Sequence, residues 1–234
     1  MGKIVVTYYN LITTYKIIPI SLLIILVAPI VLSAIIDHKR GIHAWSSNGV
    51  LLEEEVAYCI GKTAGAKAHR TIMLPRGNGE DAEIDVVCAT RKGIFVTECK
   101  YRSAPVTGDI NADQWGAYNK KLTGTYPMEN PVRQNYYHVK AVEDYLESKG
   151  YRNLRIFNLC IVFAGLRIMN KDSMKDTVIL GIDYPKTFKK YYKKLPNLLS
   201  KEEVKTLNDL FASVVGTKEQ ILEHNSKLID RYGV

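Results

Sequence analysis

The order of hydrophobic and polar residues divides the chain into an uncharged N-terminal run and a mixed body. Residues 17–36 carry no charge, and twenty helical residues span about 30 Å, which matches the hydrocarbon core of a bilayer. A cleaved signal peptide is the alternative, but its apolar run usually covers about 7–15 residues. We therefore expect one N-terminal transmembrane helix at residues 17–36, preceded by a short segment at 1–16 and followed by a juxtamembrane linker at 37–45.

The flanking charges leave the orientation of this helix open. Two basic residues precede the run and two follow it, so the rule that cytoplasmic flanks are positive gives a tie: Lys3 and Lys16 against Lys39 and Arg40. The chain has four cysteines, Cys59, Cys88, Cys99 and Cys160, and they form no CxxC pair. Three of the four lie in apolar, strand-like sequence, as buried reduced thiols do. Reduced cysteines are typical of the cytoplasm, so this pattern favours a single-pass membrane protein whose soluble body faces the cytoplasm.

The body alternates helical and strand patterns, which indicates a mixed α/β domain over residues 46–182 and a helical extension over residues 183–234. Residues 103–128 read as irregular. Runs rich in β-branched and aromatic residues predict strands, and apolar residues at helical spacing predict helices. The expected elements are helices at 46–60 and 130–150, and strands at 69–75, 82–90, 93–101, 154–163 and 177–182, with 154–163 in the centre of the sheet.

Three local patterns predict where helices begin. Asn130 followed by Pro131 is a typical N-cap and first helical residue. Ser200 and Thr217 are each followed three residues later by Glu or Gln, which is the capping-box pattern. These patterns support the helix at 130–150 and a helical C-terminal extension.

Two carboxylates face each other if the two adjacent predicted strands form a tight hairpin. A two-residue loop at 91–92 pairs Thr90 with Gly93, and the same register sets Asp85 opposite Glu98. Opposed side chains have Cβ atoms about 4.5–5.5 Å apart, where like charges destabilise the sheet. A hard divalent ion such as Mg²⁺ or Mn²⁺ would supply the countercharge. A register shifted by one residue would move Asp85 to the other face, and a hairpin with surface ion pairs needs no metal.

Lys100 lies two residues after Glu98 and therefore on the same face of its strand. Metal-assisted hydrolysis of a phosphodiester uses an ion that polarises the phosphoryl oxygen and activates a water. An ammonium beside the ion can orient that water and offset the charge of the transition state. The residue types at these positions therefore suit phosphodiester hydrolysis.

Residues 83–85 and 93–100 resemble the core of the nuclease-related domain (NERD) family, a branch of the PD-(D/E)XK nuclease superfamily. The D…ExK half-motif of that family corresponds to Asp85, Glu98 and Lys100. Three further matches follow in the family's order over about residues 46–150: residues 49–56 resemble the helix motif G-x-x-G-E-x-x-V, Trp115 follows the ExK strand, and residues 130–134 resemble N-P-x-x-Q.

The resemblance implies a restriction-endonuclease-like α/β fold, in which a mixed sheet is flanked by helices. It also implies that Glu53 assists the metal held by Asp85 and Glu98, directly or through water, and that Gln134 touches the water or the substrate phosphate. Leu52 replaces the second glycine of the helix motif, and Glu53 is chosen over the next two glutamates because it lies three residues before the motif valine. Relatives often carry Tyr four residues after the glutamine, where this chain has His138, and no role is assigned to it.

We therefore expect a membrane-anchored, Mg²⁺- or Mn²⁺-dependent nuclease that hydrolyses phosphodiester bonds, with DNA favoured over RNA as the substrate. The competing class is a catalytically silent module that binds nucleic acid or protein and is tethered to the membrane. A third possibility, if the N-terminus is cleaved, is a secreted nuclease. The sequence does not indicate an oligomeric state.

The net charge of +8 falls to +6 when residues 1–36 are set aside, because that segment holds only two lysines and no acid. A modest positive field suits a polyanionic partner or an anionic membrane surface. Residues 186–194 interleave lysines with aromatic residues and could contact nucleic-acid phosphates or lipid: Lys186, Lys189, Lys190, Lys193 and Lys194. A solvated amphipathic helix that packs Phe188 and Tyr192 is the favoured interpretation.

Overall fold

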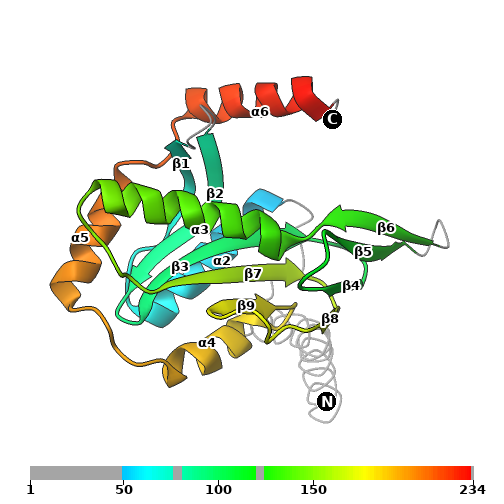
Figure 1. Ribbon diagram of the computed structural model, residues 1–234, viewed down its shortest axis with the longest axis horizontal. Coiled ribbons are helices and arrows are strands. Elements are labelled where there is room, and N and C mark those ends of the chain that lie inside the picture. The colour runs from blue at the N-terminus through cyan, green and yellow to red at the C-terminus, as the bar shows by residue number, and fades with distance from the viewer. Residues whose placement is uncertain (1–48, 76–80, 120–123, 233–234) are drawn as a thin grey trace, which may run out of the picture. The chain divides into compact units, whose positions relative to one another are not determined.

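The computed structural model of the protein describes three stretches of the chain: residues 49–75, 81–119 and 124–232 (Figure 1). These stretches belong to one compact unit, Ser46–Val234. The three predicted N-terminal parts, which together make up residues 1–45, lie outside them. Within the described stretches, no helix combines the length and the apolar character needed to cross a membrane.

A five-stranded mixed sheet forms the centre of the domain. Its strand order is β1-β2-β3-β7-β9, with the first three strands antiparallel to one another and the last three parallel. The strands are β1 (His69–Pro75), β2 (Asp81–Thr90), β3 (Gly93–Tyr101), β7 (Ile156–Phe163) and β9 (Thr177–Leu180). Strand β3 lies in the middle, whereas the sequence had indicated β7. Both have neighbours on each side and are almost continuously apolar, so hydrophobicity alone does not separate them.

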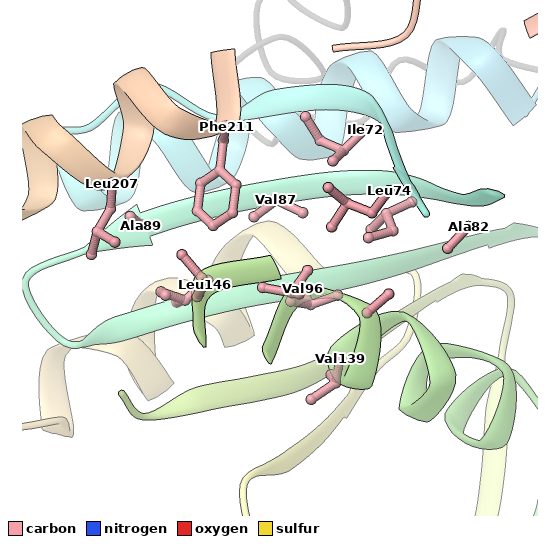
Figure 2. Close-up of a cluster of buried hydrophobic side chains, with 14 of the residues drawn as sticks. Ile72, Leu74, Ala82, Val87, Ala89, Val96, Val139, Leu146, Leu207 and Phe211 are labelled. Atoms are coloured by element: carbon pink, nitrogen blue, oxygen red, sulfur yellow. The ribbon is translucent and has the colours of Figure 1, made fainter. Parts of the chain in front are cut away.

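Helices cover both faces of this sheet (Figure 1). The helices are α2 (Gly49–Ala64), α3 (Pro131–Ser148), α4 (Tyr184–Lys194), α5 (Lys201–Ala212) and α6 (Lys218–Tyr232). Helices α3 and α5 contribute to one core cluster, and α2 and α4 contribute to the other. Figure 2 shows Phe211 of α5 reaching toward Val87 of β2 in the first cluster. The expected mixed sheet flanked by helices is therefore confirmed.

The predicted helix starts are confirmed by their hydrogen bonds. The Asn130 side chain accepts from the backbone N–H of Val132, and Pro131 occupies the first turn of α3. Ser200 forms a reciprocal capping box with Glu203 at the start of α5. The capping pattern that begins at Thr217 forms in the same way before α6, because Thr217 and the residue three positions later exchange hydrogen bonds. Each cap satisfies backbone donors that the helix itself leaves unpaired.

The prediction of an irregular segment at 103–128 is wrong. This region contributes three strands to a second sheet of order β6-β5-β4-β8. The strands are β4 (Val106–Asp109), β5 (Gln114–Asn119), β6 (Gly124–Glu129) and β8 (Leu166–Met169). Strand β4 is only four residues long and pairs with β8 far along the chain, so no local alternation predicts it. Trp115, 2% exposed, lies in the core that this sheet forms.

Helix α4 packs its aromatic residues inward. Phe188 is fully buried, and its ring meets Phe95 of β3 edge to face with centroids 5.3 Å apart. Tyr192 is also buried, whereas the five lysines of this helix are exposed. The interpretation of residues 186–194 as a solvated amphipathic helix is confirmed.

Candidate active site

The candidate site lies where strands β2 and β3 approach the end of their pairing. The antiparallel register between them reaches Val86↔Thr97, so Asp85 and Glu98 occupy the next opposed positions. The loop between the strands has two residues, and the register pairs Thr90 with Gly93, both as expected. The shifted register, which would have separated the two carboxylates, does not occur.

The backbone opposite Asp85 is distorted on the other side of β2. The register of β1 with β2 sets Thr71 opposite Asp85. Thr71 has φ 52°, a left-handed conformation that β-branched residues rarely adopt, and its carbonyl accepts a hydrogen bond from Gly216 N at 2.8 Å. Ile84 and Val87 contribute to the same core cluster although they lie three positions apart, where regular alternation would put them on opposite faces. The alternation of faces along β2 therefore changes phase at Asp85, and strain of this kind is typical of functional sites.

A hydrogen bond from β3 holds the Asp85 side chain, and the surroundings of the carboxyl disfavour its ionised form. Its Oδ2 accepts a hydrogen bond from the backbone N–H of Cys99 at 2.7 Å. Burial raises the pKa of the Asp85 carboxyl well above its usual range, and the charges of Glu98 and Glu53 raise it further. The hydrogen bond from Cys99 favours the ionised form but does not reverse this shift.

Glu98 is almost completely buried, with 1% of its side chain exposed, yet it is ionised more readily. Its Oε1 forms an ion pair with Lys100 Nζ at 2.6 Å. Burial opposes the charge, but His138 and Lys100 outweigh burial and place the pKa of Glu98 below its usual value. Within the described residues, Glu98 Oε2 has no hydrogen-bond partner. This oxygen faces His138 Nδ1 at 3.4 Å, longer than a good N–H···O bond of about 2.7–3.2 Å.

Lys100 remains a cation in this setting. Burial lowers the pKa of its ammonium group, but the ion pair with Glu98 and the charge of Asp85 outweigh burial, so the pKa lies above its usual value. At neutral pH, Lys100 therefore donates hydrogen bonds and does not accept a proton.

Glu53 extends from α2 into the same cluster of charges. Burial raises the pKa of Glu53 to about 7, with Glu83 and Glu98 raising it and Arg70 and Lys100 lowering it. The pKa of Glu53 therefore depends on Glu98 and Lys100, although α2 and α3 contribute to different core clusters. Arg70, which the sequence analysis did not single out, is a further charge that acts on Glu53.

Helix α3 supplies Gln134 and His138 from above the sheet. The side chain of Asn135 fastens the helix by donating to Val96 O at 2.9 Å and to Leu159 O at 3.2 Å. Gln134 Oε1 is buried, and no partner for it appears in the described part of the chain. His138 follows Gln134 by one helical turn, which places both on one side of the helix, and is 3% exposed. In the sequence, the four-residue spacing from Gln134 to His138 was the signal that could have indicated a role for His138.

A magnesium-like ion would need fewer protein ligands here than zinc would. No group of three or more His, Cys, Asp or Glu side chains in the described stretches could by itself enclose a metal ion. Mg²⁺ needs no such cage, because it keeps several waters and is bound by one or two carboxylates together with substrate phosphates. Among the described residues, two buried oxygens lack a hydrogen-bond partner and could contact an ion or its waters: Glu98 Oε2 and Gln134 Oε1.

The five lysines of α4 do not lie at the candidate active site. Helix α4 and α2 share the core cluster that contains Phe95. Glu98 lies three positions after Phe95 on β3, so its side chain points to the opposite face of the sheet. There it faces His138 of α3. The five lysines are therefore carried by a helix on the opposite face of the sheet from the Glu98 side chain.

Comparisons with known proteins identify one family and two proteins of distant similarity. The sequence pattern of the NERD family, described as a nuclease-related domain, matches residues 49–164. An uncharacterized protein of Bacillus anthracis is 33% identical over 73 residues, an alignment that covers 30% of this chain and 32% of that protein. The crystal structure of a protein of unknown function, AF1548, covers 70% of this chain and 79% of that chain at 17% identity and a TM-score of 0.38, and so distant a likeness supports no argument.

The family match includes every element that builds the site. It begins at α2, which carries Glu53, runs through the hairpin with Asp85 and Glu98, and ends after α3 and β7. Residues 49–164 of this chain therefore form a nuclease-related domain of the NERD family.

Proposed function

We propose that the protein is a metal-dependent nuclease that hydrolyses phosphodiester bonds in nucleic acid, with DNA favoured over RNA. The observation that carries this proposal is the pair Asp85 and Glu98, opposed at low exposure beside the charged Lys100 inside a nuclease-related domain. Like charges at opposed strand positions destabilise a sheet, and a site for a cation gives this pair a function.

Asp85 and Glu98 would hold Mg²⁺ or Mn²⁺, and Glu53 would support the ion directly or through water. When bound, such an ion polarises a phosphoryl oxygen and lowers the pKa of a bound water. Hydrolysis forms a bond from the water oxygen to phosphorus and breaks the bond from phosphorus to the leaving sugar oxygen. The water proton passes to solvent or to the leaving oxygen.

The remaining site residues orient the reactants. Lys100 keeps its proton, so it donates to the attacking water or to a non-bridging phosphate oxygen, where negative charge develops. Gln134 Oε1 can accept a hydrogen bond from the water. His138 Nδ1 lies 3.4 Å from Glu98 Oε2, so we assign His138 a positioning role.

Membrane attachment belongs to the same proposal. The uncharged run at residues 17–36 would anchor the enzyme through one helix and leave the nuclease domain in the cytoplasm. The support for this statement is the sequence pattern alone.

The test is cleavage by the full chain in mild detergent. Supercoiled plasmid, single-stranded DNA and RNA are incubated with the protein in Mg²⁺, in Mn²⁺ or in EDTA. We expect cleavage of DNA that requires the divalent ion and a loss of about 10²–10³-fold in rate when Lys100 is replaced by Met. We expect Asp85→Asn and Glu98→Gln to abolish cleavage.

Matched controls are exposed acids away from the site, Asp172→Asn and Glu147→Gln. These variants should keep full activity. Metal-dependent cleavage that persisted in both Asp85→Asn and Glu98→Gln would refute the assignment. Binding of DNA without cleavage, and without calorimetric uptake of Mg²⁺, would identify a silent binding module instead.

A further inference from the structure

A cavity of about 690 Å³ lies against α2, the edge strand β1 and the segment that precedes α6. Its lining includes Tyr58 and Lys62 of α2, Lys67 and His69 at the start of β1, and Arg70. None of these five residues contributes a hydrogen bond to the candidate active site. The cavity is therefore a second feature of the domain, with its own chemistry.

The charge of the lining is positive. Lys62, Lys67 and Arg70 contribute three positive charges, and Glu54 contributes one negative charge. Burial, together with the charge of Lys67, lowers the pKa of His69, so its imidazole is neutral. The resulting charge of +2 favours an anionic ligand.

His69 provides an independent sign of a missing partner. Its side chain is 4% exposed, and its Nε2 has no hydrogen-bond partner in the part of the chain that the structure describes. Buried polar atoms in folded proteins are nearly always paired. A ligand oxygen or a water in the cavity would supply the partner, because a neutral imidazole nitrogen donates or accepts one hydrogen bond.

Thr71 connects this cavity to the candidate active site. It lines the cavity, and the register of β1 with β2 sets it opposite Asp85. Glu54 of α2 also lines the cavity, one residue after Glu53. A chain-like anionic ligand that occupies the site would therefore pass the rim of the cavity.

We propose that this cavity is a phosphate subsite, in which Lys62, Lys67 and His69 hold a backbone phosphate of the nucleic-acid strand whose scissile bond lies at Asp85 and Glu98. The inference rests on the proposed function, because it takes the ligand of both places to be one polynucleotide. A free mononucleotide offers the same phosphate chemistry, and the experiment distinguishes the two sources.

The experiment measures binding rather than cleavage. The full chain with Asp85→Asn is titrated in EDTA against a fluorescently labelled single-stranded oligonucleotide, and anisotropy is recorded at several salt concentrations. Adding Lys62→Gln and Lys67→Gln should weaken binding about tenfold and make the slope of log K against log salt shallower by about 0.7–1.4, since each lost phosphate contact contributes about 0.7. The control pair Lys201→Gln and Lys205→Gln removes the same charge from exposed positions on α5 and should leave both quantities unchanged.

Three outcomes would overturn the inference. The first is an equal loss of affinity in the cavity and control pairs, which would indicate a general charge effect. The second is unchanged binding after Lys62→Gln and Lys67→Gln. The third is a labelled mononucleotide that binds as tightly as the oligonucleotide and loses affinity in the cavity pair, because the cavity would then be a small-ligand site.

The two proposals fail independently. A wild-type chain that binds the oligonucleotide through the cavity but cleaves nothing in Mg²⁺ or Mn²⁺ would refute the nuclease assignment alone. A chain that cleaves DNA, but binds the oligonucleotide equally well after Lys62→Gln and Lys67→Gln, would refute the cavity assignment alone.

Discussion

Replacing Glu53 with glutamine is expected to stabilise the metal-free protein at about pH 8 and to have little effect at about pH 4. Burial is the main cause that raises the pKa of Glu53 from 4.5 to about 7. A rise of about 2.5 units corresponds to ~3.4 kcal/mol of unfavourable free energy for the ionised carboxyl in the folded state. Glu53 is only partly buried, so solvent screening reduces this value, and we expect a gain of ~1–2 kcal/mol in the free energy of unfolding.

The sign follows from the direction of the shift. The pKa of Glu53 rises on folding, so its ionised form costs free energy in the folded state. This cost is absent at a pH below the pKa of the unfolded state, because the carboxyl is then protonated in both states. The cost grows between about pH 4.5 and about pH 7 and stays constant above that range. Glutamine removes it without changing the size of the side chain, so the stability difference should appear across that window.

The assay is urea unfolding of wild type and Glu53→Gln in EDTA, followed by circular dichroism across this pH range. Glu54→Gln is the matched control, because its side chain is the exposed neighbour on the same helix and its effect should stay within about 0.5 kcal/mol. A variant that is no more stable than wild type at high pH, or equally stabilised at every pH, would contradict the reasoning. The first result would mean that Glu53 is well solvated, and the second that its effect is not electrostatic.

Three further predictions concern the positioning of the site and the core around it. His138→Ala should lower the rate of cleavage about 10–100-fold, because Glu98 loses the side chain that faces it. The variant should also need a higher Mg²⁺ concentration for its half-maximal rate. An unchanged Mg²⁺ titration would contradict the positioning role. Phe188→Ala should lower the free energy of unfolding by ~3–5 kcal/mol, since the buried ring packs on Phe95, and chemical denaturation measures this loss. Asn130→Ala should cost ~2–4 kcal/mol by the same assay, because the side chain caps α3 and also donates to two backbone carbonyls; a loss below ~1 kcal/mol would show that water replaces those bonds.

The parts of the fold that local sequence determined are those in which the deciding interactions are close along the chain. The β2–β3 hairpin turns over two residues, so its register follows from the loop length. The caps at Asn130 and Ser200 are hydrogen bonds that span two or three residues. For the same reason, Asp85, Glu98 and Lys100 could be assigned to one face of one hairpin before the fold was known.

The second sheet shows what local sequence does not contain. Val106 of β4 pairs with Leu166 of β8, and the segment between them includes α3 and β7. Such strands are stabilised by partners that only the folded chain brings alongside, so their own pattern is weak. The middle position of β3 was decided in the same way, because β1 and β2 add to one side of it, and β7 and β9 add to the other.

The sequence by itself determined that two carboxylates and a lysine lie together on one hairpin, because residue type, strand alternation and a two-residue loop set their positions. Only the tertiary structure decided how each of them behaves. It surrounds Glu98 with His138 and Lys100, gives Asp85 a hydrogen bond from the backbone N–H of Cys99, and buries Glu53 enough to raise its pKa. The free energy of a buried charge depends on burial and on every charge within a few ångströms, and those neighbours come from segments far apart in the chain.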